Sequence, residues 1–171
     1  MAELLRQDDP SALDVIYDLY AERLFGYISA IIGREHDAED ALQELFVRIA
    51  RKRRQLAEAQ NLEAYLFAMA RHATQDRLRD RQANEVGLDD VLEMADETQG
   101  EKFNADEAAM VRRAVRQLPH EQNDVVTMKC FQDMTFEEIS KALDISINTA
   151  ASRYRYALQK LKKCLGEISK R

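Results

Sequence analysis

Apolar residues recur at three- and four-residue steps over most of this chain, which is the spacing of amphipathic helices. The clearest pair of helices occupies residues 135–161. Thr135 and Glu138 have the spacing of a reciprocal N-terminal capping box, and an apolar helical face follows them. The residues Asp144-Ile145-Ser146 then interrupt this face with turn and cap chemistry. Two helices joined by a turn of about three to four residues are typical of a helix-turn-helix.

The second helix of this pair has an apolar face and a polar face. Its apolar positions are Ala150, Tyr154, Ala157, Leu158 and Leu161. The polar positions that point away from them are Asn148, Ser152, Arg155, Gln159 and Lys162. Amides, hydroxyls and guanidinium groups on one face suit hydrogen bonding in a DNA groove. An ordinary amphipathic hairpin with a solvated face is the alternative that these residues alone leave open.

The N-terminal part of the chain predicts three helices, enough for a small bundle. The first begins at Ser11, ends near Gly33 and carries the apolar stripe Leu13, Ile16, Tyr17, Tyr20, Leu24, Tyr27, Ile28 and Ile31. We expect Asp37 to cap the second helix and Asn61 to cap the third. The second helix ends in the basic run 51–54, which either complements the helix dipole or contacts phosphate.

The rest of the chain divides into a linker and a second helical part. Residues 83–106 lack a sustained period and are strongly acidic, which predicts a flexible linker. A new helical pattern starts at residue 107 and should end at Leu118, because Pro119 restricts the residue before it. The sequence therefore predicts an all-α protein. Its first domain spans residues 1–82, its acidic linker residues 83–106, and its helix-turn-helix domain residues 107–171.

Composition supports a helical globular protein. The 171 residues are 46% hydrophobic and 33% charged, and five Gly and two Pro leave few places to interrupt a helix. The chain has no run of about 18 apolar residues and no apolar core behind its acidic start, so we expect neither a membrane span nor a secretory signal. The expected location is the cytoplasm.

Charge is distributed unevenly along the chain, whose net charge is −6. Residues 1–82 carry 12 Lys+Arg and 15 Asp+Glu, residues 83–106 carry 1 and 8, and residues 107–171 carry 12 and 8. An acidic protein can still bind nucleic acid where cations gather on one face of one module. The basic C-terminal part is therefore the candidate for such a surface.

Few residues offer catalytic or metal chemistry. Cys130 and Cys164 lie far apart without a CxxC motif, so we expect no disulfide framework and no thiolate metal site. The chain has no phosphate-binding glycine loop, and His36, His72 and His120 lack the spacing of metal ligands. We expect no enzyme activity, no cofactor and no metal.

Residues 37–46, DAEDALQELF, place acidic and amide side chains three and four residues apart, which suits a basic coiled coil or a solvated face. This segment is similar to the A-E-D-x-x-Q-E-x-F segment of bacterial extracytoplasmic-function sigma factors, which docks on the clamp helices of the polymerase beta-prime subunit. Asp40, Gln43 and Glu44 match position by position. The resemblance implies that Asp40, Gln43, Glu44 and Phe46 bind polymerase.

Residues 65–72, YLFAMARH, resemble the W-L-x-x-I-A-x-N segment of the same family. In the family this helix and the loop before it hold the minus-ten promoter element and one flipped base. Tyr65 stands in place of the usual Trp, and His72 in place of the Asn that touches the base. Stacking and edge hydrogen bonds can capture an unstacked base. The resemblance implies minus-ten contacts by Tyr65, Arg71, His72, Gln75 and Arg79.

The C-terminal part resembles the family's DNA-reading domain. Leu118-Pro119 is similar to the start of L-P-x-x-x-R-x-V, with Asn123 at the basic position, and residues 148–153 occupy G-T-V-K-S-R, with Ala151 at its cation. Tyr154 is expected in the core. The resemblance implies that the minus-thirty-five element is read by Asn148, Thr149, Ser152, Arg153, Arg155 and Tyr156.

The resemblance covers nearly the whole chain and implies an alternative sigma factor that directs promoter-specific transcription initiation. Its expected partners are the beta-prime clamp helices and beta flap of core RNA polymerase, promoter DNA and an anti-sigma factor. The acidic linker would thread through polymerase in a basic channel, with solvated disorder as the alternative. A sigma-like decoy that binds an anti-sigma protein without initiating transcription is the second hypothesis, and a stand-alone helix-turn-helix repressor is the third. The arrangement of the two modules in the free chain stays open.

Overall fold

The computed structural model describes residues 2–7, 9–84 and 102–168. In chain order its helices are α1 (Ala2–Arg6), α2 (Ser11–Ile32), α3 (Glu35–Arg51), α4 (Arg53–Ala57), α5 (Leu62–Asn84), α6 (Lys102–Arg116), α7 (His120–Cys130), α8 (Phe136–Leu143) and α9 (Ile147–Ile168). The described residues contain no strand, and the predicted all-α class is confirmed. Over the same residues no helix has the length and apolar character needed to cross a membrane.

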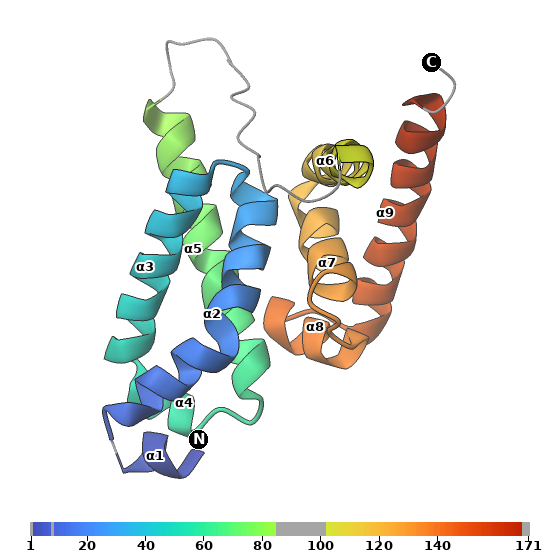
Figure 1. The fold of residues 1–171 in the computed structure, drawn as a ribbon. Coiled ribbons are helices and arrows are strands. Elements are labelled where there is room, and N and C mark those ends of the chain that lie inside the picture. The colour runs from blue at the N-terminus through green and yellow to red at the C-terminus, as the bar shows by residue number, and fades with distance from the viewer. Residues whose placement is uncertain (1, 8, 85–101, 169–171) are drawn as a thin grey trace.

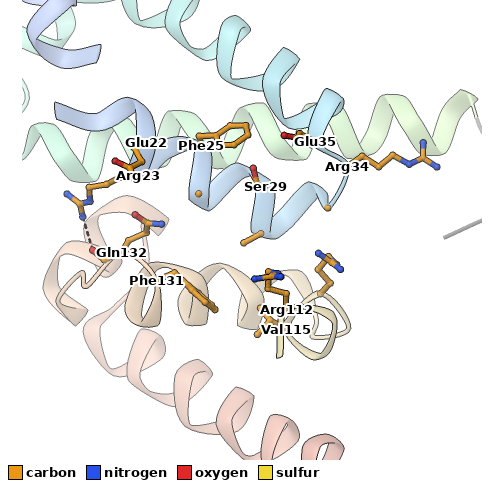
Figure 2. A pocket seen from close by; sticks show the side chains of 14 residues that line it. Glu22, Arg23, Phe25, Ser29, Arg34, Glu35, Arg112, Val115, Phe131 and Gln132 are labelled. Carbon is orange, nitrogen blue, oxygen red and sulfur yellow. Dashed lines mark hydrogen bonds between the residues drawn. The ribbon is translucent and has the colours of Figure 1, made fainter. Parts of the chain in front are cut away.

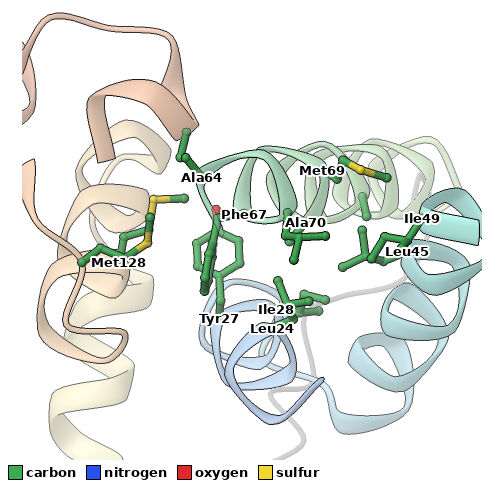
Figure 3. Packing of buried hydrophobic residues seen from close by; sticks show 14 of the residues in the cluster. Leu24, Tyr27, Ile28, Leu45, Ile49, Ala64, Phe67, Met69, Ala70 and Met128 are labelled. Carbon is green, nitrogen blue, oxygen red and sulfur yellow. The ribbon is translucent and has the colours of Figure 1, made fainter. Parts of the chain in front are cut away.

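The first module is a bundle in which α2, α3 and α5 pack against one another (Figure 1). Leu24 and Ile28 of α2 meet Leu45 of α3 and Ala70 of α5 at its centre, and all four side chains are buried (Figure 3). Burying each large aliphatic side chain stabilises the fold by roughly 1.5–3 kcal/mol. This core fixes the relative positions of α3 and α5, which carry the residues matched to polymerase and minus-ten contacts.

The predicted ends of these helices are mostly confirmed. Helix α2 starts at Ser11 and ends at Ile32, and Gly33 caps it: its φ of 80° is left-handed and its N–H donates to the Ser29 carbonyl. The Asn61 side chain accepts from the Ala64 N–H at 2.9 Å and so caps α5. The prediction that Asp37 caps α3 is wrong. Helix α3 starts two residues earlier, at Glu35, without a side-chain cap.

Two short helices in the first module were not predicted. Helices α1 and α4 have five residues each, too few for a helical period to be visible in the sequence. Helix α4 takes in part of the basic run 51–54, which was predicted to lie wholly at the end of α3. Its Leu56 is buried and holds α4 on the bundle.

The second module consists of α6 to α9 and has an additional apolar cluster. This cluster joins α6, α7 and α9 through Ala114, Val115, Leu118, Val126, Ala157 and Leu161. Helix α6 ends at Arg116, two residues before the predicted end, because the chain turns at Leu118 ahead of Pro119. Leu158 is 41% exposed, so its prediction as a core position of α9 is wrong.

Helices α5 and α6 both extend into the range predicted as linker, 83–106. Helix α5 continues to Asn84 and α6 begins at Lys102. The remainder of that prediction, residues 85–101, lies outside the described residues.

The helix-turn-helix is formed by α8 and α9, as the cap chemistry predicts. The Thr135 Oγ1 accepts from the Glu138 N–H at 3.2 Å, and the Glu138 carboxylate accepts from the Thr135 N–H at 2.8 Å. Asp144 ends α8 with a left-handed φ of 52°, a conformation that Asp tolerates better than most residues. The Ser146 Oγ accepts from the Thr149 N–H and caps α9. Local hydrogen bonds therefore fix both ends of the turn.

The two modules pack against each other in one compact arrangement (Figure 1). The core of the first module continues into the second, where Val125 and Met128 of α7 are fully buried in the same cluster. Met128 lies beside Tyr27 of α2 and Phe67 of α5, whose rings meet edge to face at 5.7 Å (Figure 3). The structure thus resolves the arrangement that the sequence left open.

Replacing Thr135 with Ala should lower the free energy of unfolding by about 1 kcal/mol, the usual effect of losing a helix N-cap. The reason is that the Glu138 N–H at the start of α8 loses its acceptor. Urea unfolding followed by circular dichroism measures the change. Ser152→Ala is the control, because it removes a hydroxyl from the interior of α9, away from the helix N-terminus; an equal loss in both variants would contradict the cap assignment.

The capping box should also make the free energy of unfolding depend on pH. Hydrogen bonds from the Thr135 N–H and hydroxyl lower the pKa of Glu138. A lowered folded-state pKa means that this contribution is complete above the unfolded value of about 4.3 and is lost as pH falls through the folded value. Glu138→Gln should therefore be less stable than wild type at pH 6, and the difference should shrink below about pH 4. Urea midpoints at both pH values test this, and a constant difference would refute it.

Candidate functional site

The residues matched to polymerase binding lie on one helix, α3, and its carboxylates are partly held by cations. Arg77 of α5 donates through Nη2 to Asp40 at 2.6 Å and to Asp37 at 3.2 Å. Gln43 and Glu44 are exposed, one turn further along α3. Gln43 and Glu44 are therefore accessible to a partner, with Glu44 also 3.9 Å from the Arg48 guanidinium on the same helix, whereas Asp40 ties α3 to α5.

An aromatic pair extends this polar patch. Phe46 is half-buried, and its ring lies 4.9 Å from that of Tyr17 on α2. Tyr17 is 54% exposed and Val47 is 50% exposed. Tyr17 was expected to face the core with the rest of its stripe, and this expectation is wrong. Periodicity placed Tyr17 only one residue from the buried Ile16, at the edge of the stripe, where burial depends on the neighbouring helix.

The residues matched to the minus-ten element fall into two groups on α5. His72, Gln75 and Arg79 follow one another at three- and four-residue steps and share one face of the helix. Tyr65 precedes His72 by two turns, so it lies over the same face. Arg71 is different, because its Nε donates to the Asp124 carboxylate of the second module at 2.9 Å. The structure places four of the five residues together and turns the fifth towards the second module. The surface on which α2 and α5 of the first module contact α7 and α8 of the second is called the seam.

The basic run lies beside this face. The Tyr65 hydroxyl donates to the Gln55 Oε1 at 3.4 Å, which connects α5 to the residue after the run. Residues 50–55 line a hollow of about 490 Å³. Arg51 and Lys52 on its wall are exposed. Both the dipole interpretation and the phosphate interpretation agree with this position, since α3 ends at Arg51.

The residues matched to the minus-thirty-five element are on α9. Asn148, Arg155 and Tyr156 are exposed, and the Arg155 guanidinium lies over the Tyr156 ring at 5.5 Å. Thr149 and Ser152 are partly exposed. Arg153 is bound through Nη2 to the Glu121 carboxylate of α7 at 2.8 Å. An Arg153 engaged in this way positions α9 against α7, whereas Asn148, Arg155 and Tyr156 are open to solvent.

Tyr154 belongs to the packing of the second module, as predicted. It is partly buried, and its ring meets Phe136 of α8 edge to face at 5.6 Å. Its hydroxyl lies 3.5 Å from the Cys130 Sγ, and this contact together with burial raises the pKa of Tyr154. Cys130 and Cys164 are both free thiols.

A groove of about 730 Å³ runs between the modules (Figure 2). Its walls come from α2, α6 and the end of α7, with Phe25, Val115 and Phe131 as apolar surface. Arg116 lies over Gly33, where an added Cβ would stand 3.0 Å from the Arg116 side chain. Burial, with the nearby charges of Arg112 and Arg113, lowers the pKa of Arg116. No sequence pattern predicts this groove, since its walls come from three separate segments.

Comparison with known proteins identifies both modules. The family description "Sigma-70 region 2" matches residues 16–84, and "Sigma-70, region 4" matches residues 108–161. Sigma factor SigZ of Bacillus subtilis is 26% identical over 90% of this chain and 86% of its own length. The extracytoplasmic-function sigma factor SigK of Mycobacterium tuberculosis is 25% identical over 92% of this chain and 87% of its own length. The chain is an extracytoplasmic-function sigma factor.

Solved structures share the fold of this sigma factor. RpoE of Bartonella quintana, in complex with the anti-sigma factor NepR, is 18% identical with a TM-score of 0.72, covering 90% of this chain and 96% of that one. CnrH, in complex with the cytosolic domain of CnrY, is 17% identical with a TM-score of 0.75, covering 97% of this chain and 95% of that one. The fold of both modules is therefore shared.

Proposed function

We propose that this sigma factor binds core RNA polymerase through α3 and directs promoter-specific initiation through α5 and α9. The first module, residues 1–82, would hold the minus-ten element, and the second, residues 107–171, the minus-thirty-five element. The segment 83–106 would connect them through polymerase. The observation that carries the proposal is one chain with matches to both sigma-70 regions and exposed residues at the matched positions of α3, α5 and α9.

The polymerase surface combines charge with apolar contact. Gln43 and Glu44 would meet basic residues of the beta-prime clamp helices, while Phe46 and the neighbouring Tyr17 bury apolar area beside them. Aromatic residues surrounded by polar groups are the usual anchors of protein interfaces. The beta flap would contact the second module.

The DNA surfaces divide between stacking and hydrogen bonding. On α5, Tyr65 offers a ring for an unstacked base, and His72, Gln75 and Arg79 offer polar groups along one face. On α9, Asn148 and Arg155 offer an amide and a guanidinium for base edges or phosphates. The isolated chain should bind DNA weakly, because its net charge of −6 opposes phosphate.

We further propose an anti-sigma factor as a partner, and a cytoplasmic location. RpoE and CnrH, which share the fold, were solved with such a protein or with the cytosolic domain of CnrY. The chain would have no catalytic chemistry of its own. The exposed cations Arg79 and Arg155 disfavour the decoy hypothesis, because a protein that only binds an anti-sigma factor does not need them.

Run-off transcription with purified core polymerase tests the proposed function. Templates would be the promoters found by mapping transcripts after overexpression of the sigma factor. Addition of the chain should produce discrete transcripts that core polymerase alone does not make. The absence of such transcripts together with the absence of core binding would contradict the proposal, and core binding without transcripts would favour the decoy.

Glu44→Ala together with Asp40→Ala should weaken core polymerase binding at least tenfold, measured by fluorescence anisotropy of labelled sigma factor. Losing charges that meet a basic partner removes complementary contacts at the interface. Asp37→Ala is the matched control. It removes another carboxylate bound to Arg77 but none of the matched patch. A similar loss of binding in the control would show that the ion pairs act by stabilising the fold.

Arg155→Ala should reduce promoter-selective transcription about tenfold or more while leaving core binding unchanged. Loss of a base contact typically changes affinity by about 1–3 kcal/mol. Lys163→Ala is the control, because Lys163 is an exposed cation on the same helix and lies outside the matched residues. Equal transcription by the two variants would show that Arg155 does not contact promoter DNA.

A further inference from the structure

One carboxylate joins the two modules at a buried point. Asp124 of α7 has a side chain only 6% exposed, and both of its oxygens accept hydrogen bonds from the other module. Oδ1 accepts from the Tyr27 hydroxyl of α2 at 2.8 Å, and Oδ2 accepts from the Arg71 Nε of α5 at 2.9 Å. The Tyr27 side chain is fully buried. The seam is therefore closed by a charged group that accepts one hydrogen bond on each oxygen from the other module.

The seam has a second polar contact and an apolar border. Arg23 of α2 donates through Nη2 to the Gln132 carbonyl after α7, and to Glu63 of α5, both at 2.7 Å (Figure 2). Met128 and Met134 are buried at the same seam. The closed arrangement thus rests on specific bonds as well as on apolar burial.

The closed arrangement is too short to hold a promoter at both elements. Sites centred at positions −10 and −35 lie about 25 base pairs apart, which is about 85 Å along B-DNA. A compact chain of 171 residues has a radius of gyration of about 16 Å and a diameter of about 40 Å. The 17 residues 85–101 can span up to about 60 Å when extended. The modules must separate before both elements are bound, and the chain is long enough to allow it.

We propose that Asp124 is an internal competitor for promoter DNA: its carboxylate holds Arg71 and so keeps the free sigma factor closed until the modules separate. The proposal rests on the proposed function, in which Arg71 belongs to the minus-ten surface. A guanidinium that binds a carboxylate binds a phosphate through the same N–H groups. In the closed form, Arg71 is the one matched minus-ten residue that donates to the second module.

The chemistry of the seam allows it to open. A buried ion pair gives up hydration when it forms, so its net contribution is small even though breaking one partner alone is strongly unfavourable. When the modules separate, a DNA phosphate would take the place of the Asp124 carboxylate as the partner of Arg71. Arg71 is then paired with an anion in both the closed form and the DNA-bound form. Opening would expose Asp124 to water, where a carboxylate is well hydrated. If only the open form binds DNA, the apparent DNA affinity equals the affinity of the open form multiplied by the fraction of molecules that are open.

Small-angle scattering of the free chain tests the closed form without any promoter or polymerase. Wild type should show a radius of gyration of about 16 Å. Asp124→Asn should increase it, because the buried carboxylate charge that pairs with Arg71 is lost. Asp133→Asn is the matched control: it makes the same charge change at an exposed residue whose left-handed φ of 54° Asn also tolerates. Equal radii for the two variants would overturn the proposal.

Binding to a labelled single-stranded oligonucleotide of mixed sequence tests the competition. Asp124→Asn should bind at least fivefold more tightly than Asp133→Asn, since more molecules are open and Arg71 is released. The gain should disappear when Arg71→Ala is combined with Asp124→Asn, measured against Arg71→Ala alone. A gain of the same size without Arg71 would refute the competitor role.

A second variant avoids the charged residues. Tyr27→Phe removes only the hydroxyl that donates to Asp124 Oδ1 at 2.8 Å and leaves that buried oxygen without its partner. Tyr27→Phe should therefore favour separation of the modules, with an increase in radius and in oligonucleotide binding. Circular dichroism checks that its helices are retained. Compact scattering from Tyr27→Phe and Asp124→Asn alike would refute the role of Asp124 in keeping the modules closed, whereas failed run-off transcription by a chain that is closed as described would refute only the proposed function.

Discussion

The Asp124 carboxylate accepts hydrogen bonds from α2 and α5, and together with the buried Val125 and Met128 beside it this contact sets where the second module lies on the first. Burial raises the pKa of Tyr27, and the adjacent Asp124 charge raises it further, so Tyr27 stays a protonated donor. Arg71 supplies the compensating charge. Because buried acceptors need partners, sliding α7 along the bundle would break both bonds together. The seam therefore has one register.

Local chemistry explains why much of the fold could be predicted from the sequence. Thr135 with Glu138, Asp144 and Asn61 act on neighbours within a few residues, so their spacing alone identifies helix ends. Helices α1 and α4 are too short for a period to show. Tyr17 and Leu158 lie at the edges of apolar stripes, and their exposure depends on which helix packs beside them. Pattern reasoning predicts a stripe more reliably than its edges.

The pairing between modules could not be predicted, because its partners are distant in the sequence. Tyr27 and Asp124 are 97 residues apart, and Arg71 and Asp124 are 53 apart. The environment of Asn123 could not be predicted from the sequence either. It stands where the family pattern has a basic residue, yet it is buried and accepts from the Thr127 hydroxyl at 2.9 Å. None of the matched site residues on α3, α5 and α9 is buried, and about half are exposed, but Arg71 and Arg153 are engaged by carboxylates of α7.

Helix α7 thus connects α5 and α9, the two helices proposed to contact DNA, through its acidic residues. Glu121 binds Arg153 of α9, and Asp124 binds Arg71 of α5. The two contacts differ in exposure, since the Glu121 side chain is 63% exposed and that of Asp124 is 6% exposed. The exposed pair can exchange with water or phosphate at little cost in free energy. The buried pair can exchange only when the modules separate, so opening of the seam and release of Arg71 are a single event.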